Sequence, residues 1–468
     1  MSSLSLQHPA LASAQRLFSA WLNYRLAYRD QYGVAIAIVA DQQLLWATGF
    51  GYANIEAQLP ATAKTIFRVA SITKLFTATA IMQLRDQGKL NLHDAIQQHL
   101  PWFNMTEAFP EEPPITILNL LTHTAGLPRE PLFDHWLSSR FPDWPAIKEL
   151  LPTQQTILPR DSKWKYSNLA LALAGEIVAA VAGQSYYDYV REQILRPLGM
   201  TDSYIETIDA ADARLATGYG RRQSNGQRTV APHTDSAGLS AAFNLATTAI
   251  DLAKFASFQL RADDDADNQV LKARTRREMH RPHWVNPDWS GGWGIGFEIL
   301  RQNGQTFHGH GGAVQGFRTG VYFSLAEKLG AVALTNADDG DPVTILTKAL
   351  TWFGPAIVAA RQNPDAREDL PAEWAAYYGR YRNVWGDQEI LAYHGQLVAI
   401  SPDAPDPAAG RVTLEPAGPP HHFRLNHPQT GFGSHGEIVH FELDSNGRAT
   451  RLVGPGAATN GSVRIEVW

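Results

Sequence analysis

The sequence predicts an α+β fold followed by a small all-β domain. Two apolar runs in residues 32–54 flank the polar Asp41-Gln42-Gln43, a pattern typical of a β-hairpin. Residues 66–260 are mostly helical in pattern, and strand-like runs return between residues 291 and 336. If the early and late strands pair, they form one antiparallel sheet flanked by helices, with the helical middle of the chain as a lobe.

Composition and charge narrow the possible functions. The chain has 468 residues, of which 44% are hydrophobic, enough for about two or three packed domains. Its net charge is −6 and no basic stretch stands out, so a nucleic acid is not expected as a partner. Because cysteine is absent, disulfides, thiolate nucleophiles and zinc–thiolate sites are excluded.

The N-terminus and the apolar runs bear on location. Residues 1–22 have no basic region followed by an apolar core, so no signal peptide is predicted. We expect a cytoplasmic location for the chain as printed, and a periplasmic or secreted one if a leader has been removed. The longest apolar run, residues 169–183, is too short to span a bilayer and contains Glu176, so we expect a buried helix and no membrane partner.

Helices are expected at both ends of the first domain, which is predicted to span residues 1–362. The first helix is predicted over residues 11–30 and the closing helix over residues 341–362. Four polar residues are expected to cap helices or to lie in their first turns: Asp94, Thr116, Ser167 and Asp251.

The last part of the chain changes character after a polar, proline-containing linker predicted at residues 363–372. Residues 373–468 contain short strand-like runs separated by Gly, Asn, Asp and Pro, which predicts a small antiparallel barrel or sandwich. The runs are residues 377–382, 389–394, 396–401, 411–416, 421–426, 437–443, 449–454 and 463–468.

Ser71 and Lys74 lie at the start of an apolar, helix-like run, "FRVASITKLFTATAIMQLRDQGKL". Residues i and i+3 share a helix face, so the lysine amine is placed to reach the serine Oγ. A serine nucleophile needs a neighbouring base, and a lysine in an apolar pocket loses enough basicity to serve as one. Amides at the helix start add a positive field for a developing oxyanion. The alternative is a helix cap followed by a solvated lysine, and the S-x-x-K pattern alone does not decide.

A second candidate motif is Tyr166-Ser167-Asn168, at the start of the buried helix. Residues two apart in an extended segment point the same way, so the phenol and the carboxamide are placed to face one cavity. The phenol would act as a general base if nearby cations such as Lys74 lowered its pKa. The alternative is that Ser167 or Asn168 only caps the helix while Tyr166 packs on the surface.

A third candidate motif is the histidine- and glycine-rich segment of residues 308–312, which precedes a predicted strand. Glycines in a strand allow a ligand or another backbone to approach, and exposed amides there would face the one at Ser71. Metal binding by His308 and His310 is an alternative, although no nearby Asp or Glu completes a ligand set. A glycine-rich bulge with a structural histidine is another.

The order of these motifs, S-x-x-K, then Y-x-N, then H-x-G, resembles that of serine β-lactamases and penicillin-binding proteins. The likeness is closest to class C β-lactamases and their esterase and peptidase relatives, and it covers residues 10–360. The stretches "LLTHTAGLP", "ILRPLGMTDS", "SGGWGIGFEI" and "GHGGAVQGFRTG" add to it. It implies a β-lactamase/transpeptidase-like sheet with a helical lobe, and residues 373–468 resemble the lipocalin-like barrel appended to some members.

The resemblance implies roles for the residues of the first two motifs. Ser71 would be the nucleophile that forms an acyl-enzyme. Lys74 and Tyr166 would share the proton transfers, and Asn168 would orient the substrate amide or the lysine.

The resemblance also implies roles for the third motif. His310 would stand where true β-lactamases have the lysine of a K-T-G triad, and Gly312 would be its third member. The backbone amides of Ser71 and Ala313 would form the oxyanion hole. His308 also fits an H-x-G pattern, but the following glycines and Phe317 favour His310.

Histidine in place of that lysine changes the expected substrate. A lysine supplies a fixed charge for a carboxylate, whereas histidine is mostly neutral near pH 7. The expected reaction is therefore hydrolysis of a small ester, amide or peptide, of the carboxylesterase or D-amino-acid peptidase type, with no cofactor. A β-lactamase or penicillin-binding DD-peptidase is the first alternative, and a non-catalytic binding module of the same fold is the second. The C-terminal domain is expected to cover the site or to mediate oligomers.

Three other residues near the motifs receive structural interpretations. His123 in "LLTHTAGLP" is expected to fix the backbone of a turn. Trp164 and Trp293 are expected to form part of the pocket wall, since large aromatic residues dominate cores and pockets.

Overall fold

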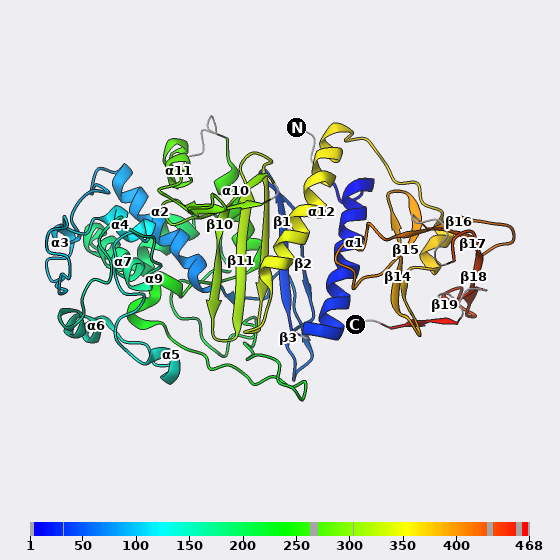
Figure 1. Cartoon of the computed structure of the whole chain (residues 1–468), viewed down its shortest axis with the longest axis horizontal. Helices are drawn as coiled ribbons and strands as arrows, with labels where there is room; N and C mark the ends of the chain where they lie inside the picture. The colour runs from blue at the N-terminus through cyan, green and yellow to red at the C-terminus, as the bar shows by residue number, and fades with distance from the viewer. Residues whose placement is uncertain are drawn as a thin grey trace. The chain divides into compact units, whose positions relative to one another are not determined.

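The computed structural model describes residues 4–30, 32–262, 270–302, 304–427, 434–454 and 461–466, which form two compact units (Figure 1). The first unit is Tyr32–Leu346, and the second combines Met1–Gln31 with Thr347–Trp468. The domain limits expected from the sequence, 1–362 and 373–468, stay a prediction.

The first unit contains an eight-stranded antiparallel sheet in the order β2-β1-β12-β11-β10-β9-β8-β7. Its strands are β1 (Val34–Ala40), β2 (Gln43–Phe50), β7 (Trp284–Val285), β8 (Gly291–Trp293), β9 (Glu298–Gln302), β10 (Gln305–Val314), β11 (Phe317–Ser324) and β12 (Leu329–Thr335). Shorter pairings join β3 (Tyr52–Asn54) to β4 (Leu59–Pro60) and β5 (Phe67–Arg68) to β6 (Ala246–Thr247).

Pairing between β1 and β12 closes the sheet across the sequence. The register runs from Val34 opposite Thr335 to Ala40 opposite Leu329. Every residue of both strands is buried, as expected for strands with continuous apolar sequences covered on both faces. The early and late strands therefore pair as predicted, and the predicted α+β fold class is confirmed.

The helices of the first unit form most of the lobe beside the sheet (Figure 1). They are α2 (Thr73–Asp86), α3 (Ile96–His99), α4 (Ile117–Thr122), α5 (His135–Ser138), α6 (Trp144–Leu150), α7 (Asn168–Ala182), α8 (Tyr186–Val190), α9 (Ser240–Phe243), α10 (Ala249–Leu260) and α11 (Ala273–Met279). α10 packs on strands of the sheet, whereas α2, α4, α7 and α9 pack on one another.

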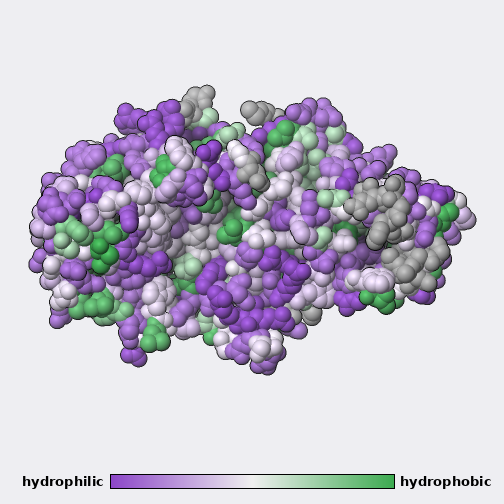
Figure 2. All heavy atoms as spheres, viewed as in Figure 1, coloured by the Kyte–Doolittle hydropathy of each residue, from purple (hydrophilic) through white to green (hydrophobic). Residues whose placement is uncertain are grey.

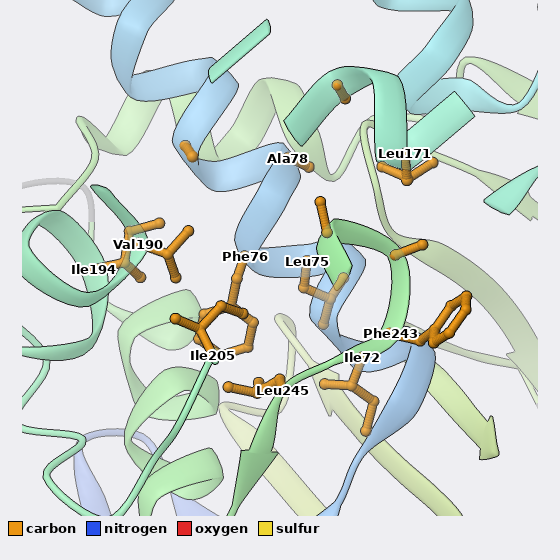
Figure 3. Packing of buried hydrophobic residues seen from close by; sticks show 14 of the residues in the cluster. Ile72, Leu75, Phe76, Ala78, Leu171, Val190, Ile194, Ile205, Phe243 and Leu245 are labelled. Atoms are coloured by element: carbon orange, nitrogen blue, oxygen red, sulfur yellow. The ribbon is translucent and has the colours of Figure 1, made fainter. Parts of the chain in front are cut away.

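Helix α2 is the central helix of the lobe. Figure 3 shows side chains of α2 such as Leu75 and Phe76 among apolar residues of neighbouring segments, including Leu171 of α7, Ile205 and Leu245. Each of these side chains is fully buried, so the helix is fixed in rotation and in translation along its axis. This packing holds the first turn of α2 in place.

The predicted helix boundaries are largely confirmed. Thr116 and Ser167 are the N-caps of α4 and α7, and each side chain accepts a hydrogen bond from an amide of the first turn. Asp251 lies in the first turn of α10. The prediction for Asp94 is wrong, because Asp94 lies outside α3, whose N-cap is Ala95.

The second unit contains a closed antiparallel barrel of eight strands. They are β13 (Gly379–Asn383), β14 (Gly386–Tyr393), β15 (Gln396–Ile400), β16 (Val412–Pro416), β17 (His422–Asn426), β18 (Ile438–Leu443), β19 (Ala449–Val453) and β20 (Ser462–Ile465). Each strand overlaps one of the runs identified in the sequence, so the predicted all-β barrel is confirmed. Aromatic side chains, among them Tyr381, Phe423 and Phe441, fill its interior.

Two helices pack with the barrel in the second unit: α1 (Pro9–Arg25) and most of α12 (Pro342–Gln362). Leu17 of α1 packs against Leu391 and Val398, which alternate with the inward-facing residues of β14 and β15. Phe353 of α12 meets Phe18 at 6.4 Å between ring centroids.

Two helical segments are apolar over a long stretch, whereas the surface is mostly hydrophilic on the face in view. Helix α12 is long and apolar enough to span a membrane. So is α7 if residues 186–195 are counted with it, although the pair is bent by 83°. The core helices of soluble proteins can have the same length and hydropathy. Figure 2 shows mostly hydrophilic residues on the face in view, with hydrophobic residues in small separate patches. Among the described residues on this face, no large apolar patch is seen.

Candidate active site at the start of helix α2

Ser71 lies in a short 3-10 turn, Ala70–Ile72, that runs directly into α2. Thr73 holds the turn, because its Oγ1 donates to the Ala70 carbonyl at 2.6 Å and accepts from the Leu245 amide at 3.0 Å. Ala70 has a φ of 49°, a conformation that costs a residue with a Cβ about 1–2 kcal/mol. The serine is thus presented from a fixed, strained turn at the N-terminal end of the helix.

Lys74 is fully buried one turn along α2, and its Nζ lies 3.0 Å from Ser71 Oγ. The amine also donates to the Ala242 carbonyl at 2.8 Å. Burial lowers the pKa of Lys74 well below its usual range, although the carboxylate of Glu130 opposes the shift. A neutral amine has a lone pair, so the lowered pKa favours Lys74 as the group that accepts the proton of Ser71. The alternative of a solvated lysine is wrong.

Tyr166 lies beside this pair. The centroid of its ring is 4.9 Å from Lys74 Nζ and 5.1 Å from the Arg129 guanidinium carbon. Burial raises the pKa of Tyr166, and a hydrogen bond with Ser71 and the charge of Arg129 offset this only in part. The expectation that nearby cations lower this pKa is therefore wrong, because desolvation outweighs them. The phenol stays neutral and is available as a hydrogen-bond donor.

His123 supports the segment that carries Tyr166. It is the left-handed C-cap of α4, with a φ of 60°. Its Nδ1 accepts from the Ser167 amide at 3.2 Å, and its carbonyl accepts from the Lys165 amide at 2.9 Å. Its ring lies 4.5 Å from the ring of Tyr166. The predicted role in fixing a turn is confirmed by these hydrogen bonds.

Asn168 is the first residue of α7 and is buried. Its Nδ2 donates to Glu130 Oε1 at 2.5 Å. The segment that carries Glu130 is fixed to the start of α7, because the Asn168 amide donates to the Arg129 carbonyl at 2.8 Å and Ser167 Oγ donates to the Pro128 carbonyl at 2.6 Å. Ser167 caps the helix, and Asn168 keeps a side chain available for other contacts.

The third motif brings His310 into the site and leaves His308 out of it. The ring of His310 lies 6.2 Å from Tyr166 and 5.4 Å from Trp293, and burial lowers its pKa to about 3. His308 instead stacks on Phe323, and its Nε2 lies 3.1 Å from the His280 carbonyl. His310 is therefore neutral at physiological pH.

Strand β10 reaches the Ser71 turn at Gly312. A Cβ at this position would lie 2.1 Å from the Val69 carbonyl oxygen and 2.3 Å from Thr319 Oγ1, so only glycine fits. β9 pairs with β10 as far as Gly309, whereas β11 pairs with it to Val314. Among the described strands, residues 310–314 thus keep one edge unpaired. Ala313 on this segment is exposed.

Two cavities have lining residues that neighbour the motif residues in sequence or in space. One of about 150 Å³ is lined by residues that include Trp164, Trp293 and Glu298. The other, of about 300 Å³, is lined by residues that include Trp136, Ala313 and Arg318. Trp164 and Trp293 line the smaller cavity, whose lining does not include Ser71, Lys74 or Tyr166, so their place in the wall of the catalytic pocket stays a prediction.

Two further features concern what the site holds. Over the described ranges, no three side chains of His, Asp or Glu converge as a metal site would require. Glu130, Arg129 and the Ala242 carbonyl lie at the site although they were not predicted from the sequence. Glu130 and Arg129 directly follow the quoted stretch "LLTHTAGLP", which is the only sequence signal that points to them. No sequence pattern identifies a carbonyl such as that of Ala242, since any residue type supplies it.

Comparison with known proteins assigns this chain to a family. The model of the family described as Beta-lactamase matches residues 19–351. Beta-lactamase-like protein 2 from Dictyostelium discoideum is 30% identical over 304 residues, which are 63% of this chain and 54% of that protein. The chain thus spans about half the length of this curated relative.

Solved structures show the same fold. The octameric penicillin-binding protein homologue from Pyrococcus abyssi has a TM-score of 0.62 at 24% identity and covers 92% of this chain and 96% of its own. The D-amino acid amidase from Ochrobactrum anthropi SV3 gives 0.61 at 22%, covering 75% and 99%. The class C β-lactamase from Rhodobacter sphaeroides gives 0.59 at 20%, covering 74% and 100%. At these identities the likeness shows the fold alone.

Proposed function

Because the chain belongs to the beta-lactamase family, we propose that it is a serine hydrolase that cleaves small ester or amide bonds through an acyl-enzyme on Ser71. The observation that carries the proposal is the 3.0 Å contact between Lys74 Nζ and Ser71 Oγ. The complete burial of Lys74 adds to it, because burial favours the neutral amine that a general base requires.

Acylation begins when Ser71 Oγ attacks the substrate carbonyl carbon and Lys74 accepts the hydroxyl proton. The carbonyl π bond opens and its electron pair moves to the oxygen. The backbone amides of Ser71 and Ala313 stabilise that oxyanion. The intermediate then collapses, and the leaving alcohol or amine takes a proton from Lys74, relayed by the neutral phenol of Tyr166.

Deacylation repeats these steps with water. Lys74 accepts a proton from the water as its oxygen attacks the acyl carbon, and the proton returns to Ser71 Oγ as the acid leaves. The Lys74 amine therefore ends in the state in which it began. Asn168 binds the acyl part of the substrate during both steps.

Neutral His310 supports esters and small amides over β-lactams. A β-lactam or a peptide C-terminus presents a carboxylate beside the scissile bond, and a histidine with a pKa of about 3 offers it no charge. The carboxylesterase and D-amino-acid peptidase types both fit this site, and a β-lactamase or DD-peptidase fits it less well. A non-catalytic binding module would not require the contact between Lys74 Nζ and Ser71 Oγ.

The test is a parallel rate assay of the wild type and Ser71→Ala. The panel holds 4-nitrophenyl acetate, 4-nitrophenyl butyrate, D-alanine 4-nitroanilide and a chromogenic cephalosporin. We expect the esters or the anilide to react, and Ser71→Ala to lower their kcat/KM by about 10³-fold or more. Labelling of Ser71 by a fluorophosphonate probe is the second readout. Turnover that survives the substitution would contradict the proposal, and the absence of both turnover and labelling would favour the binding module.

A further inference from the structure

The smaller of the two cavities near the motif residues has a volume of about 150 Å³. Its lining includes three tryptophans and one carboxylate: Trp164, Trp284, Trp293 and Glu298. The described lining residues include no Lys, Arg or His, and none of them takes part in the proposed mechanism. The cavity therefore has aromatic walls, one acidic group and no basic group of its own.

The sheet places three of these side chains in one row. Trp284 on β7 is the cross-strand partner of Trp293 on β8, and Trp293 is the partner of Glu298 on β9. Cross-strand partners in an antiparallel sheet project from the same face. Trp164 comes from the segment before α7, and its ring centroid lies 5.0 Å from that of Trp293. Three indole rings and a carboxylate thus border one space.

Glu298 is held in this row by a hydrogen bond and has no cation beside it. Gly309 is the strand partner of both Glu298 and Tyr322, and across this glycine the Tyr322 hydroxyl donates to Glu298 Oε2 at 2.5 Å. Burial raises the pKa of Glu298, and the hydrogen bond from Tyr322 offsets this only in part. Among the described residues, no Lys, Arg or His forms an ion pair with this carboxylate. A bound cation would compensate its charge.

Two hydrogen-bond donors of the cavity lining also lack partners. Trp164 Nε1 and Trp293 Nε1 are buried, and neither has a hydrogen-bond partner in the described part of the chain. An indole N–H only donates, and buried donors are nearly always paired. A ligand that fits this lining therefore carries an oxygen acceptor as well as a positive charge.

We propose that this cavity binds a small quaternary ammonium ion that also carries a hydroxyl or carbonyl oxygen. Tryptophan rings attract cations to their faces, and aromatic cages recur as binding sites for quaternary ammonium groups. Glu298 supplies the counter-charge. A primary ammonium group donates three hydrogen bonds, and the indoles offer no acceptor, so an ion without N–H groups fits better.

The volume agrees with this ligand class. An apolar cavity of similar volume in another protein binds benzene, and the tetramethylammonium ion has one non-hydrogen atom fewer than benzene. The trimethylammonium head group of a larger ligand therefore fits inside. Because the lining excludes the residues of the proposed mechanism, the inference does not depend on an acyl-enzyme at Ser71.

Choline and 3,3-dimethylbutan-1-ol test the site, because they have the same shape and differ by a cationic nitrogen in place of a carbon. Isothermal titration calorimetry at pH 8, which favours the carboxylate, and at constant ionic strength measures the two Kd values. We expect choline to bind about 10-fold or more tightly than the alcohol.

Two substitutions in the lining sharpen the test. Glu298→Gln keeps an acceptor for Tyr322 and removes the charge, so it is expected to weaken choline binding by about 10-fold or more. For the alcohol, which has no charge, we expect a change of less than about threefold. Trp284→Leu keeps an apolar wall and removes a ring, so it is expected to weaken choline binding by about fivefold or more.

The controls are two exposed positions outside the lining. Trp289 is 68% exposed in the turn between β7 and β8, and Glu149 lies on the exposed surface of α6, so Trp289→Leu and Glu149→Gln are expected to bind choline as the wild type does. The proposal is disproved if wild-type protein binds choline no more tightly than the alcohol, a result that needs no variant to fold. It is equally disproved if folded Glu298→Gln and Trp284→Leu proteins both bind choline with the wild-type Kd, since the ion would then bind elsewhere.

Discussion

Lys74 and Arg380 are both fully buried basic side chains, one in each unit, and they differ in their partners. Arg380 lies on β13 with its Nε 2.9 Å from Glu389 Oε2 and its Nη2 3.1 Å from the Ala20 carbonyl. Its guanidinium carbon is 5.2 Å from the ring centroid of Tyr24. Within the described ranges, the hydrogen-bond partners of Lys74 are both neutral: the Ser71 hydroxyl and the Ala242 carbonyl.

The difference separates a structural cation from a base. A buried charge is tolerated when a carboxylate and hydrogen bonds compensate its lost hydration, which is the situation of Arg380. Without such a hydrogen-bonded partner, burial favours the neutral amine, and the pKa of Lys74 is lowered accordingly. Burial of Lys74 thus lowers the stability of the fold and favours a neutral amine beside Ser71. This combination is frequently found at active sites.

Replacing Lys74 tests the first half of the comparison and has the largest expected effect. Lys74→Met keeps the apolar stem and removes the amine, so kcat/KM for 4-nitrophenyl butyrate is expected to fall by about 10³-fold, within the range for loss of a general base. Lys89→Met, which alters an exposed lysine beyond the end of α2, is the control and is expected to keep full activity. Activity retained by Lys74→Met would leave Ser71 without the proposed base.

The same variant is expected to be more stable than the wild type. The pKa of Lys74 is lower in the folded than in the unfolded chain, so between these two values the unfolded chain binds more protons. Wild-type stability therefore rises with pH across that window, and Lys74→Met lacks this dependence. Thermal unfolding from neutral pH towards pH 10 measures it. In the folded enzyme, protonation of the Lys74 amine in acid removes the general base. The acidic limb of the plot of kcat/KM against pH therefore reports the titration of Lys74. A variant less stable than the wild type at neutral pH would indicate a charged, compensated lysine.

Replacing Arg380 tests the second half. Arg380→Met leaves Glu389, whose side chain is 18% exposed, without its ion-pair partner, so the free energy of unfolding is expected to fall by about 3 kcal/mol, as measured by chemical denaturation. Arg451→Met is the control in the same barrel, because both side chains of its pair with Glu442 are exposed, by 47% and 42%, and such a pair contributes about 1 kcal/mol or less. An equal loss in both variants would mean that burial does not distinguish the two arginines.

The sequence predicted those features that depend on local spacing. The i, i+3 pair on a helix, the Y-x-N turn and the strand periodicity are local, and each lies in the structure where the pattern placed it. The pKa direction of Tyr166 was predicted wrongly, because desolvation depends on tertiary packing that no local pattern encodes. Glu130 was missed for the same reason, since only the hydrogen bonds at the start of α7 bring it beside Asn168.

Replacing Gly312 tests whether the geometry of the site, and not only its chemistry, depends on the close packing of β10. Of the effects predicted here, this loss of activity is expected to be the smallest. In Gly312→Ala the new Cβ would overlap the Val69 carbonyl, so β10 must move away from the turn that holds Ser71. A shift of this kind displaces the Ala313 amide, and we expect kcat/KM to fall by about 10- to 100-fold with only a small change in KM. Gly311→Ala is a matched control, because a Cβ there would meet its nearest neighbours, the Thr319 carbonyl and Tyr322 hydroxyl oxygens, at 3.8 Å. Equal losses in the two variants would mean that the strand as a whole, and not its approach to Ser71, sets the rate.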